Sequence, residues 1–532
     1  MKFSAVWKKL HRSEVGMIED DKLHEECGVF GVWMHNPGGI DTEGPEERTE
    51  GGTAGADCRD AGLSVAQLIY FGLLALQHRG QESAGIVCNG LITAAEEDAA
   101  PAAGRAGAPA FQLEKGMGLV SEVFAPNKLA ALEGTAGLGH TRYSTVGGST
   151  AVNAQPLIGH SKQGPLAVVH NGNLTNADII RELLEESGSV FRTESDSEVL
   201  LNLVARSAVK KGAAEAAWDA TQAVQGSFSF IVMTGDSVIG ARDRNGIRPL
   251  CIGTLGSGYV LASESCALDA VGAVFLRDVD PGEIVVVNDE GLYSLQGSEK
   301  TRTQTCSFEY IYFARPDSVV DNKSVYEIRR ESGKILAREA PVEADFVAAV
   351  PDSGVPAAIG YSEKSGTPYG IALIKNRYAG RSFIKPSDGD RRQTVQVKLN
   401  PMTGAVQGKR VVLIDDSIVR GTTMQMLVSK LRQAGAAEVH VRIASPPVAF
   451  PCYFGIDTPY REDLISSRHD EERVREHIGA DSLAFLSLEG LAAALGGKDA
   501  FCTGCFAGVY PVGAPIGTSA AVFSGEGVKN EV

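Results

Sequence analysis

The sequence has no uninterrupted apolar run of the roughly 18 to 20 residues that a bilayer-spanning helix needs, although 43% of its 532 residues are hydrophobic. The segment Met1 to Leu23 carries charges and has no apolar core of the signal-peptide kind. Positive charge is also scarce, because 50 Lys and Arg stand against 66 Asp and Glu, a net charge of −16. Such a chain repels nucleic acid and anionic membranes. We therefore expect a cytoplasmic enzyme of small molecules, with no nucleic-acid or membrane partner.

Cysteine is sparse, with nine residues spread along the chain. An odd and thinly spread set is not typical of a secreted disulfide scaffold. In a reducing compartment, clustered cysteines more often bind metal or do chemistry. The chain is longer than one ordinary domain, which usually has about 100 to 200 residues. Its length therefore predicts two or three globular units.

The pattern of apolar residues changes near residues 296–304, a polar stretch that we take as a domain boundary. Before it, short apolar runs punctuated by glycine predict antiparallel sheets, and after it, apolar strands alternate with helix-like stretches such as Thr423 to Ala434 and predict a parallel sheet with crossover helices. Two interruptions, 36–62 and 93–110, have no apolar period and are expected to be loops. The expected strands are CGVFGVW, FGLLALQHRG, AGLGHTRYST, PLAVVHNGNL, FSFIVMTG and GYVLASES, then DFVAAV, GIALI, RVVLIDD and EVHVRIAS.

The sharpest local signal is VVLIDDSIVRGTT, Val411 to Thr423. An apolar strand ends in two carboxylates and continues through a loop of small residues into a helix. Loop N–H groups and a helix N-terminus attract phosphate, while the two acids would repel it and must face hydroxyls or a divalent cation. A ribose bearing a phosphate satisfies both, although paired acids before a helix could also simply cap it. The predicted binding residues are Asp415, Asp416, Ser417, Arg420, Gly421, Thr422 and Thr423.

This thirteen-residue string resembles the signature of the type I phosphoribosyltransferases. The resemblance implies that the acids hold the ribose hydroxyls and the loop holds the 5′-phosphate. It also implies that VPDSG, Val350 to Gly354, is the pyrophosphate loop, and that Ser353, Asp415 and Asp416 hold Mg²⁺. The basic segment Lys375 to Ser387 is by itself typical of a solvated face. The family has a flexible basic lid there, so Lys375 and Arg377 are implied to contact phosphoribosyl pyrophosphate.

Cys27 becomes an N-terminal residue if the segment before it is removed. Its α-amine, with a pKa of about 7.7 to 8.0, can then accept the proton of its own thiol. With residue 26 attached, the nitrogen is an amide and cannot do so. A single cysteine before GVFG would by itself be a small core residue.

Several strings together give Cys27 a different role: CGVFG, LQHRGQESAG, GHTRYST, HNGNLTN and SDSE resemble the class II glutamine amidotransferases of the N-terminal-nucleophile fold. The resemblance implies that Cys27 is the nucleophile and that Arg142 and Asp196 bind the carboxylate and α-amine of glutamine. Asn171 and the N–H of Gly172 are implied to form the oxyanion hole.

A second cysteine set begins with Cys502 and Cys505 in C-x-x-C spacing, which can place two sulfurs on one ion or cluster. Four thiolates could equally bind zinc on chemical grounds. Cys306 and Cys452 occupy positions that match cluster ligands in one branch of a known family. That resemblance implies a 4Fe–4S cluster held by all four, with a structural or oxygen-sensing role.

Both halves together resemble the glutamine phosphoribosylpyrophosphate amidotransferases, in their iron–sulfur-containing, propeptide-processed branch. The leader is longer than in that family, and 36–62 is an insertion. The implied fold is a four-layer αββα N-terminal-nucleophile glutaminase domain followed by a type I phosphoribosyltransferase α/β domain with a parallel sheet. The implied segments are a propeptide 1–26, a glutaminase domain 27–300, a phosphoribosyltransferase domain 301–512 and a tail 513–532.

The implied reaction hydrolyses glutamine through a Cys27 thioester and passes ammonia to phosphoribosyl pyrophosphate, the first step of purine synthesis. The resemblance further implies one 4Fe–4S cluster and one Mg²⁺ per subunit, inhibition by purine nucleotides, and a homotetramer. Two alternatives remain: another class II glutamine amidotransferase, from which the Val411 to Thr423 loop distinguishes this chain, and a non-catalytic, nucleotide-responsive binding protein. The intact set of Cys27, Asn171, Asp415 and Asp416 favours the enzyme.

Overall fold

The computed structural model describes residues 27–35, 62–91, 109–143, 148–295, 302–376, 399–458, 460–497 and 500–512. The predicted propeptide, the predicted tail, most of both loop insertions and Arg377 lie outside these residues. Within the described ranges, no helix combines the length and the apolar character that crossing a membrane requires.

The described chain forms two compact units. Residues 27–328, 450–461 and 495–512 make up the first, which we call the sandwich unit, and residues 329–449 and 462–494 make up the parallel-sheet unit. Two late segments thus belong to the earlier unit. The predicted domain ranges 27–300 and 301–512 remain predictions, and the boundary stretch 296–304 is described only from residue 302.

Backbone pairing explains why the late segments join the sandwich unit. Strand β14 (Thr305–Cys306) pairs in parallel with β23 (Phe501–Cys502), and the amide of Phe450 donates to the carbonyl oxygen of Cys505 at 3.0 Å. The phenol of Tyr510 donates to the carbonyl oxygen of Pro451 at 2.6 Å. These bonds satisfy backbone groups that would otherwise be buried without partners.

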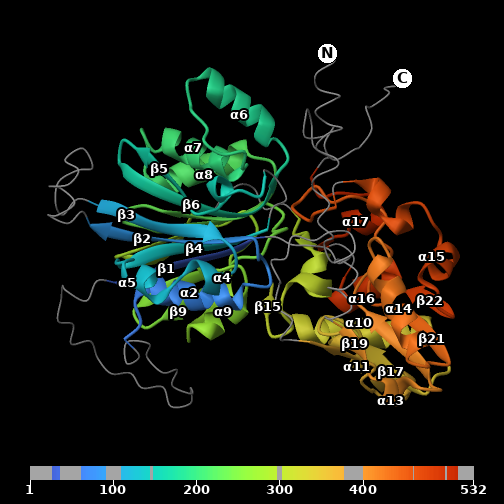
Figure 1. Ribbon diagram of the computed structural model, residues 1–532. Coiled ribbons are helices and arrows are strands. Elements are labelled where there is room, and N and C mark those ends of the chain that lie inside the picture. The colour runs from blue at the N-terminus through green and yellow to red at the C-terminus, as the bar shows by residue number, and fades with distance from the viewer. Residues whose placement is uncertain are drawn as a thin grey trace, which may run out of the picture. The chain divides into compact units, whose positions relative to one another are not determined.

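Two antiparallel sheets form the centre of the sandwich unit, with helices over both outer faces (Figure 1). The predicted four-layer αββα arrangement is confirmed. The first sheet has the order β11-β9-β10-β1-β4-β2-β3, with β1 (Gly28–Trp33), β2 (Ser83–Leu91), β3 (Pro109–Met117), β4 (Ala136–Arg142), β9 (Cys251–Leu255), β10 (Gly258–Ala262) and β11 (Val274–Asp278). The second has the order β13-β12-β8-β7-β6-β5, with β5 (Leu157–Ser161), β6 (Gly164–Leu174), β7 (Gly226–Met233), β8 (Val238–Arg242), β12 (Ile284–Asn288) and β13 (Gly291–Leu295).

Helices cover the outer face of each sheet. Those over the first sheet are α2 (Val65–Ala75), α4 (Val120–Val123), α5 (Pro126–Ala130) and α9 (Ser265–Ala270), and those over the second are α6 (Ala177–Glu186), α7 (Ser197–Ser207) and α8 (Ala213–Ala223). Short elements near the cysteine set are the π-helical turn η3 (Glu309–Phe313) and α17 (Gly504–Ala507).

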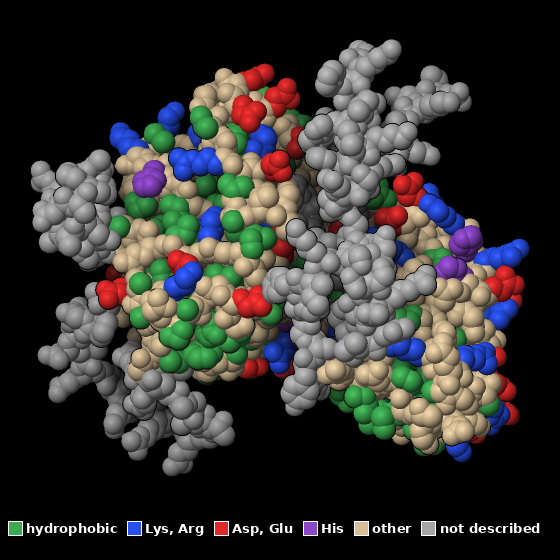
Figure 2. Space-filling view, in the orientation of Figure 1, with side chains coloured by type: hydrophobic (Ala, Val, Ile, Leu, Met, Phe, Trp, Pro, Cys, Tyr) green, Lys and Arg blue, Asp and Glu red, His purple; other side chains and the backbone are tan. Residues whose placement is uncertain are grey.

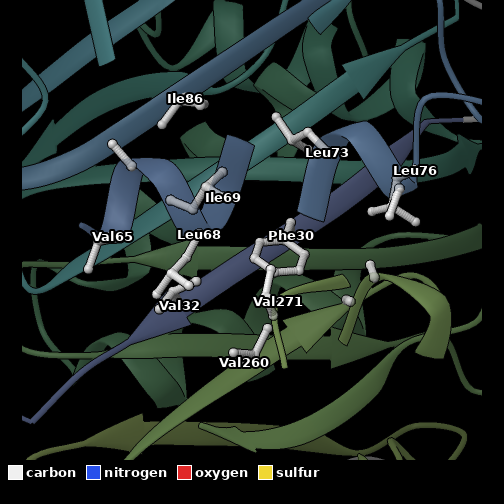
Figure 3. Close-up of a cluster of buried hydrophobic side chains, with 14 of the residues drawn as sticks. Phe30, Val32, Val65, Leu68, Ile69, Leu73, Leu76, Ile86, Val260 and Val271 are labelled. Atoms are coloured by element: carbon white, nitrogen blue, oxygen red, sulfur yellow. The ribbon is translucent and has the colours of Figure 1, made fainter. Parts of the chain in front are cut away.

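Strand β1 is buried on both faces because it lies inside this layered stack. Successive side chains of a strand point to opposite faces. Val29 and Trp33 accordingly enter the core between the two sheets, whereas Phe30 and Val32 pack against α2 (Figure 3). Both faces of β1 therefore need apolar side chains, which explains the near-continuous apolar sequence GVFGVW.

Helix α2 corrects one prediction, since FGLLALQHRG was expected to be a strand. The helix begins with a capping box in which Ser64 and Gln67 exchange hydrogen bonds, the Gln67 amide to Ser64 Oγ at 3.3 Å and the Ser64 amide to Gln67 Oε1 at 2.9 Å. It approaches β1 so closely that a Cβ at Gly72 would collide with the Phe30 ring. A short apolar run does not distinguish a buried helix from a strand by periodicity.

The parallel-sheet unit contains the predicted parallel sheet, in the order β17-β20-β21-β22. The expected helix around Thr423 to Ala434 is confirmed as α14. The strands are β17 (Phe346–Ala349), β20 (Arg410–Asp415), β21 (Glu438–Ile443) and β22 (Ser482–Phe485), and the helices of this half of the chain are α10 (Val325–Glu339), α11 (Val355–Ser365), α13 (Thr403–Val406), α14 (Thr422–Gln433), α15 (Glu471–Ile478) and α16 (Leu488–Leu495).

One predicted strand of this sheet is wrong. GIALI, residues 370–374, does not continue as a strand of this sheet: Tyr369 just before it bridges to Val347 of β17, and the amide of Gly370 donates to the carbonyl oxygen of Val347 at 2.8 Å. The chain then leaves the sheet, and β18 (Leu373–Lys375) pairs with β19 (Leu399–Pro401) in a separate two-stranded sheet. The fourth parallel strand is β22, whose short sequence SLAF was not predicted as a strand.

Charges of both signs lie next to each other over the surface of the parallel-sheet unit (Figure 2). Helix α15 illustrates the pattern, because Arg473 pairs with Glu476 at 3.1 Å and Arg475 with Glu472 at 2.7 Å. Exposed pairs of this kind contribute little to stability, because water and salt screen them. They indicate that this face is solvated.

Candidate active sites

Cys27 immediately precedes β1 and lies at the end of β4. Its Sγ is 3.9 Å from the carbonyl oxygen of Tyr143. Gly28 pairs with Thr141 in the β1–β4 ladder, so Cys27 is placed beside Arg142. Among the described cysteines, only this thiol is partly exposed, whereas the other seven are buried.

The space between the two sheets changes from apolar to polar toward the end at which Cys27 lies. Every second residue of a strand faces this space, so the change can be followed along three strands. On β4, β6 and β7 the last apolar residues of the shared core are Leu138, Val169 and Ile231, and the polar residues that follow on the same face are His140 and Arg142, Asn171, and Ser229. The structure thus brings Cys27, Arg142 and Asn171 to one end of the sandwich.

Asn171 is fully buried, and among the described residues neither its Nδ2 nor its Oδ1 has a hydrogen-bond partner. The hydroxyl of Ser229, directly opposite on β7, is in the same condition. A buried polar group without a partner costs about 1 to 3 kcal/mol. A ligand that hydrogen-bonds to the amide would offset this cost, so the side chain is suited to receive one.

Gly172 follows Asn171 and has a φ of +139°. A Cβ there would collide with the carbonyl oxygen of Ser227 on the neighbouring strand. The position therefore requires glycine both for its backbone conformation and for the close approach of β7.

Arg142 and Asp196 are both buried, and each is fixed by hydrogen bonds. Arg142 Nη1 donates to Glu82 Oε1 at 3.2 Å and to the carbonyl oxygen of Gly148 at 3.4 Å. Asp196 lies immediately before α7, and its Oδ2 accepts from the amide of Leu174 at 3.0 Å. One fixed cation and one fixed anion can bind the two charged ends of an amino acid.

Two histidines link the sheets beneath this site. His140 Nε2 lies 3.0 Å from the carbonyl oxygen of His170, which directly precedes Asn171. Burial lowers the pKa of His140 to about 3 and also lowers the pKa of His170, although Asp196 opposes the second shift. Both imidazoles are therefore neutral at cellular pH and serve the architecture of the site.

The second site lies at the carboxyl ends of β17 and β20, which are parallel neighbours. The amide of Val350 donates to the carbonyl oxygen of Ile414 at 2.8 Å, so the two predicted loops lie side by side. Ser353 Oγ donates to Asp416 Oδ2, and Ser417 Oγ donates to Asp416 Oδ1 at 2.8 Å. Ser353 therefore lies beside Asp416, one of the two acids that are implied to hold Mg²⁺ with it.

The loop ends at Gly421, which has a φ of +85° and caps α14. A Cβ at this glycine would lie 2.9 Å from Cδ1 of Ile465. Thr422 and Thr423 form the first turn of α14, where the helix dipole and the N–H groups of the first turn favour an anion. A helix N-terminus of this kind can accept a phosphate.

Two predicted cations near this loop have acidic neighbours. Arg420 Nη2 lies 3.7 Å from Asp463, and Lys375 Nζ lies 3.1 Å from Asp352. All four side chains are substantially exposed, so these ion pairs are weak and a phosphate could replace the carboxylate.

The four predicted cluster cysteines lie together in the sandwich unit. Cys306 and Cys502 are direct partners in the β14–β23 pair, Cys505 lies in α17, and Cys452 Sγ accepts a hydrogen bond from the amide of Phe454 at 3.3 Å. Burial raises the pKa of Cys505 well above the usual value, and the other three thiols raise it further. In the ranges that the structure describes, no three His, Cys, Asp or Glu side chains are grouped as around a single metal ion.

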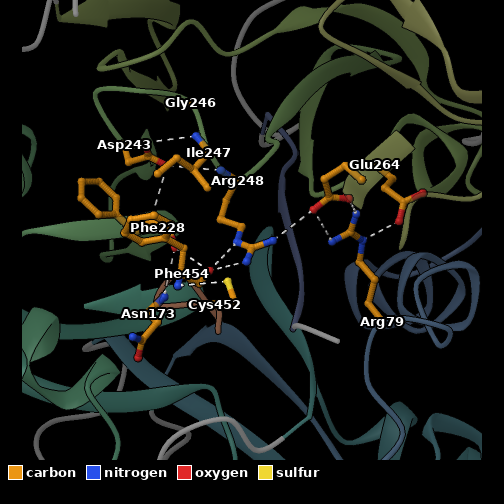
Figure 4. Close-up of polar contacts among 12 residues, drawn as sticks. Arg79, Asn173, Phe228, Asp243, Gly246, Ile247, Arg248, Glu264, Cys452 and Phe454 are labelled. Carbon is orange, nitrogen blue, oxygen red and sulfur yellow. Dashed lines mark hydrogen bonds and ion pairs between the residues drawn. The ribbon is translucent and has the colours of Figure 1, made fainter. Parts of the chain in front are cut away.

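A buried charge network lies within the sandwich unit and was not predicted. Arg79 pairs with Glu264 and Glu309, and Arg248 Nη1 lies 3.5 Å from Glu309 (Figure 4). Burial alone would raise the pKa of Glu264, but Arg79 and His78 outweigh it and hold that pKa well below its usual range. Arg79 belongs to the motif LQHRGQESAG, but the sequence does not show that it pairs with Glu264 and Glu309.

We expect Asn171→Ala to lower kcat for glutamine about a hundredfold with little change in KM, because an oxyanion donor acts mainly in the transition state. Steady-state glutaminase kinetics would measure this. Ser161→Ala, on the outer part of the same sheet, is the control. A loss that appears only in KM would contradict the oxyanion role.

Comparisons with known proteins cover both units. A family model described as "Glutamine amidotransferase domain" matches residues 140–270, and one described as "Phosphoribosyl transferase domain" matches residues 317–444. The amidophosphoribosyltransferase of Bacillus subtilis is 46% identical over 501 residues, which are 93% of this chain and 96% of that protein. The one of Archaeoglobus fulgidus is 48% identical over 458 residues, 85% of this chain and 96% of that protein.

A solved structure agrees with these sequence matches. The glutamine phosphoribosylpyrophosphate amidotransferase from B. subtilis, complexed with ADP and GMP, superposes with a TM-score of 0.79 at 44% identity. The match covers 92% of this chain and 98% of that one. The sequence matches and the structural match thus agree over most of the chain.

Proposed function

The chain belongs to the amidophosphoribosyltransferase family, and from that premise we propose which of its residues carry the two half-reactions. The protein transfers the amide nitrogen of glutamine to phosphoribosyl pyrophosphate and forms phosphoribosylamine, glutamate and pyrophosphate, the first step of purine biosynthesis. The observation that supports the assignment of residues best is the polar end of the sandwich, where Cys27, Arg142 and the unpartnered amide of Asn171 meet.

In the first half-reaction, the Cys27 thiolate attacks the side-chain carbonyl carbon of glutamine. Asn171 and the N–H of Gly172 stabilise the oxyanion. The proton taken from the thiol passes to the leaving nitrogen, which departs as ammonia, and water then hydrolyses the thioester to glutamate. Arg142 and Asp196 hold the substrate's carboxylate and α-amine.

The base in this step is the α-amine of Cys27, which requires removal of residues 1–26. The two nearby imidazoles support this assignment, because burial lowers the pKa of His140 to about 3 and also lowers the pKa of His170, which makes both weak proton acceptors. The test is the intact mass and N-terminal sequence of the protein made in a cytoplasm, with a glutaminase assay on the same sample. Glutamine hydrolysis by a chain that still carries residues 1–26 would exclude the α-amine as base.

In the second half-reaction, ammonia attacks C1 of the ribose and pyrophosphate leaves. Asp415 and Asp416 face the ribose hydroxyls, and the loop from Ser417 to Thr423 holds the 5′-phosphate. Mg²⁺ would neutralise the pyrophosphate, and Ser353 and the two acids would hold it. Carboxylate and hydroxyl oxygens suit this ion, which usually keeps water and substrate phosphates as its other ligands.

The four cysteines fit a 4Fe–4S cluster. They are buried, come from three segments, and include one sulfur that accepts a backbone N–H, as cluster sulfurs commonly do. Four thiolates could also bind zinc, and metal analysis distinguishes the two. The cluster would supply structural stability or oxygen sensitivity.

We expect protein purified without oxygen to contain iron and sulfide in a ratio near one to one, and the Cys505→Ser variant to lose both. Elemental analysis and the visible absorption spectrum would measure this. Cys88→Ser, at a buried cysteine outside the set, is the control. Zinc in place of iron would overturn the assignment.

Purine nucleotides are proposed to inhibit the enzyme by competing for the phosphate cradle from Ser417 to Thr423, since a nucleotide carries the same 5′-phosphate. The B. subtilis relative was solved with ADP and GMP. AMP and GMP should therefore raise the apparent KM for phosphoribosyl pyrophosphate. An unchanged rate at a subsaturating concentration of this substrate would contradict the idea. A homotetramer is proposed as the assembly, and sedimentation would measure it.

A further inference from the structure

We propose that Gly455 is a positioning residue for the oxyanion hole, because the segment from Cys452 to Gly455 forms the rigid backing of Gly172. This inference rests on the proposed role of Gly172. It also gives the segment two functions, since its first residue belongs to the four-cysteine set and its last contacts the glutamine site.

The backbone of this segment is bonded to the strands that carry the oxyanion hole (Figure 4). Asn173 Nδ2 donates to the carbonyl oxygen of Tyr453 at 2.8 Å. Ser227 Oγ and Arg248 Nε donate to the carbonyl oxygen of Phe454 at 2.8 Å and 3.0 Å. Two consecutive carbonyl groups are thus held by side chains of Asn173 on β6, Ser227 on β7 and Arg248, which follows β8.

Gly455 itself lies against Gly172. It has a φ of +102°, and an ideal Cβ would be 3.3 Å from the carbonyl carbon of Gly172 and 3.2 Å from Arg248 Nη2. On its other side, Gly172 is in close contact with the backbone of Ser227. The oxyanion glycine is therefore enclosed between two backbones and has little freedom to move away from either.

Arg248 makes this arrangement rigid. Its side chain is fully buried, and the Asp243 carboxylate accepts from the amides of Arg248 at 3.2 Å and of Ile247 at 3.1 Å. Glu309 provides the opposite charge to the guanidinium at 3.5 Å. A cation fixed in this way holds the Phe454 carbonyl in one place.

Rigidity matters at this point because an oxyanion hole is effective only when its donors are already aimed at the developing charge, and small misplacements reduce the rate strongly. A side chain at residue 455 would press on Gly172 and tilt its N–H. The phosphoribosyl transfer does not involve that N–H, so added ammonium salts should bypass the defect.

The experiment compares Gly455→Ala with Gly291→Ala. Gly291 has a similar φ of +117° but nothing within 4 Å of its Cβ position, so it reports the backbone strain alone. We expect Gly455→Ala to lower kcat with glutamine about 10- to 100-fold, with KM for glutamine and the ammonium-driven rate unchanged. Gly291→Ala should keep both rates.

A second readout is the rate at which iodoacetamide alkylates Cys27. This small neutral reagent does not use the oxyanion hole, so the rate should be the same in Gly455→Ala and Gly291→Ala. Ser227→Ala, which removes one donor to Phe454, should show the same selective loss to a smaller extent, and it provides a test if Gly455→Ala does not fold. A wild-type kcat in both Gly455→Ala and Ser227→Ala would overturn the inference. Equal losses with glutamine and with ammonium in these variants would overturn it as well. If the unaltered enzyme does not use glutamine, the proposed function fails instead.

Discussion

The Cys27→Ala variant is expected to lose at least about 10⁴-fold of its glutamine-dependent rate, because removing the nucleophile of a covalent mechanism removes the thioester pathway altogether. Its rate with ammonium salts should be unchanged, because ammonia then reaches the second site without glutamine. Coupled assays of phosphoribosylamine formation with each nitrogen source, at saturating phosphoribosyl pyrophosphate, would measure both rates.

Cys88→Ala is the matched control for this experiment. Cys88 belongs to the same unit, but it is fully buried in β2, and burial raises the pKa of its thiol to about 12. Such a thiol is a poor nucleophile, so both rates should survive its replacement apart from a small loss of stability. Residual glutamine use by Cys27→Ala at more than a few per cent would show that another group is the nucleophile.

Replacing both Asp415 and Asp416 by Asn is expected to lower the rate about 10³-fold with glutamine and with ammonium alike. Both carboxylates are buried, so each charge-assisted hydrogen bond to a ribose hydroxyl or to a bound cation contributes about 1.5 to 3 kcal/mol. Loss with both nitrogen sources distinguishes this defect from the one at Cys27. Equilibrium binding of phosphoribosyl pyrophosphate should weaken in parallel.

Asp345→Asn provides the comparison for the acidic pair. Asp345 lies beside the opposite end of β20, where its carboxylate accepts from the amide of Arg410 at 2.8 Å. The substitution tests whether any carboxylate near this strand matters, and it should leave both rates intact. If the double Asn variant kept its ammonium-driven rate, the acids would have only a structural role.

The conformation of the predicted phosphate-binding loop could be derived from the sequence because its parts are contiguous. A strand, a turn and a helix N-terminus follow one another within thirteen residues, so local preferences predict the strand and the helix on either side of this loop without knowledge of the rest of the fold. Helix α2 shows the limit of such reasoning. Its apolar run is compatible with a helix and with a strand, and the capping residues Ser64 and Gln67 lie outside that run.

For the glutamine site, the sequence predicts which residues take part but not how they are arranged. The motifs point to Cys27, Arg142 and Asn171, but local sequence does not show that the buried amide of Asn171 is left unpartnered between two sheets. That arrangement depends on the register of β4, β6 and β7, which long-range pairing decides.

The sequence by itself was sufficient to predict the family, to find the two classes of motif and to single out the four cysteines as a set. Each of these depends on residue types and their spacing along the chain. Only the tertiary structure decided that residues 450–461 and 495–512 join the sandwich unit, and that Gly455 lies against Gly172. Contacts between residues so far apart in the chain depend on packing and on the pairing of buried charges such as Arg248 and Glu309. Local preferences do not encode such contacts, because their free energy arises only when the whole core has formed.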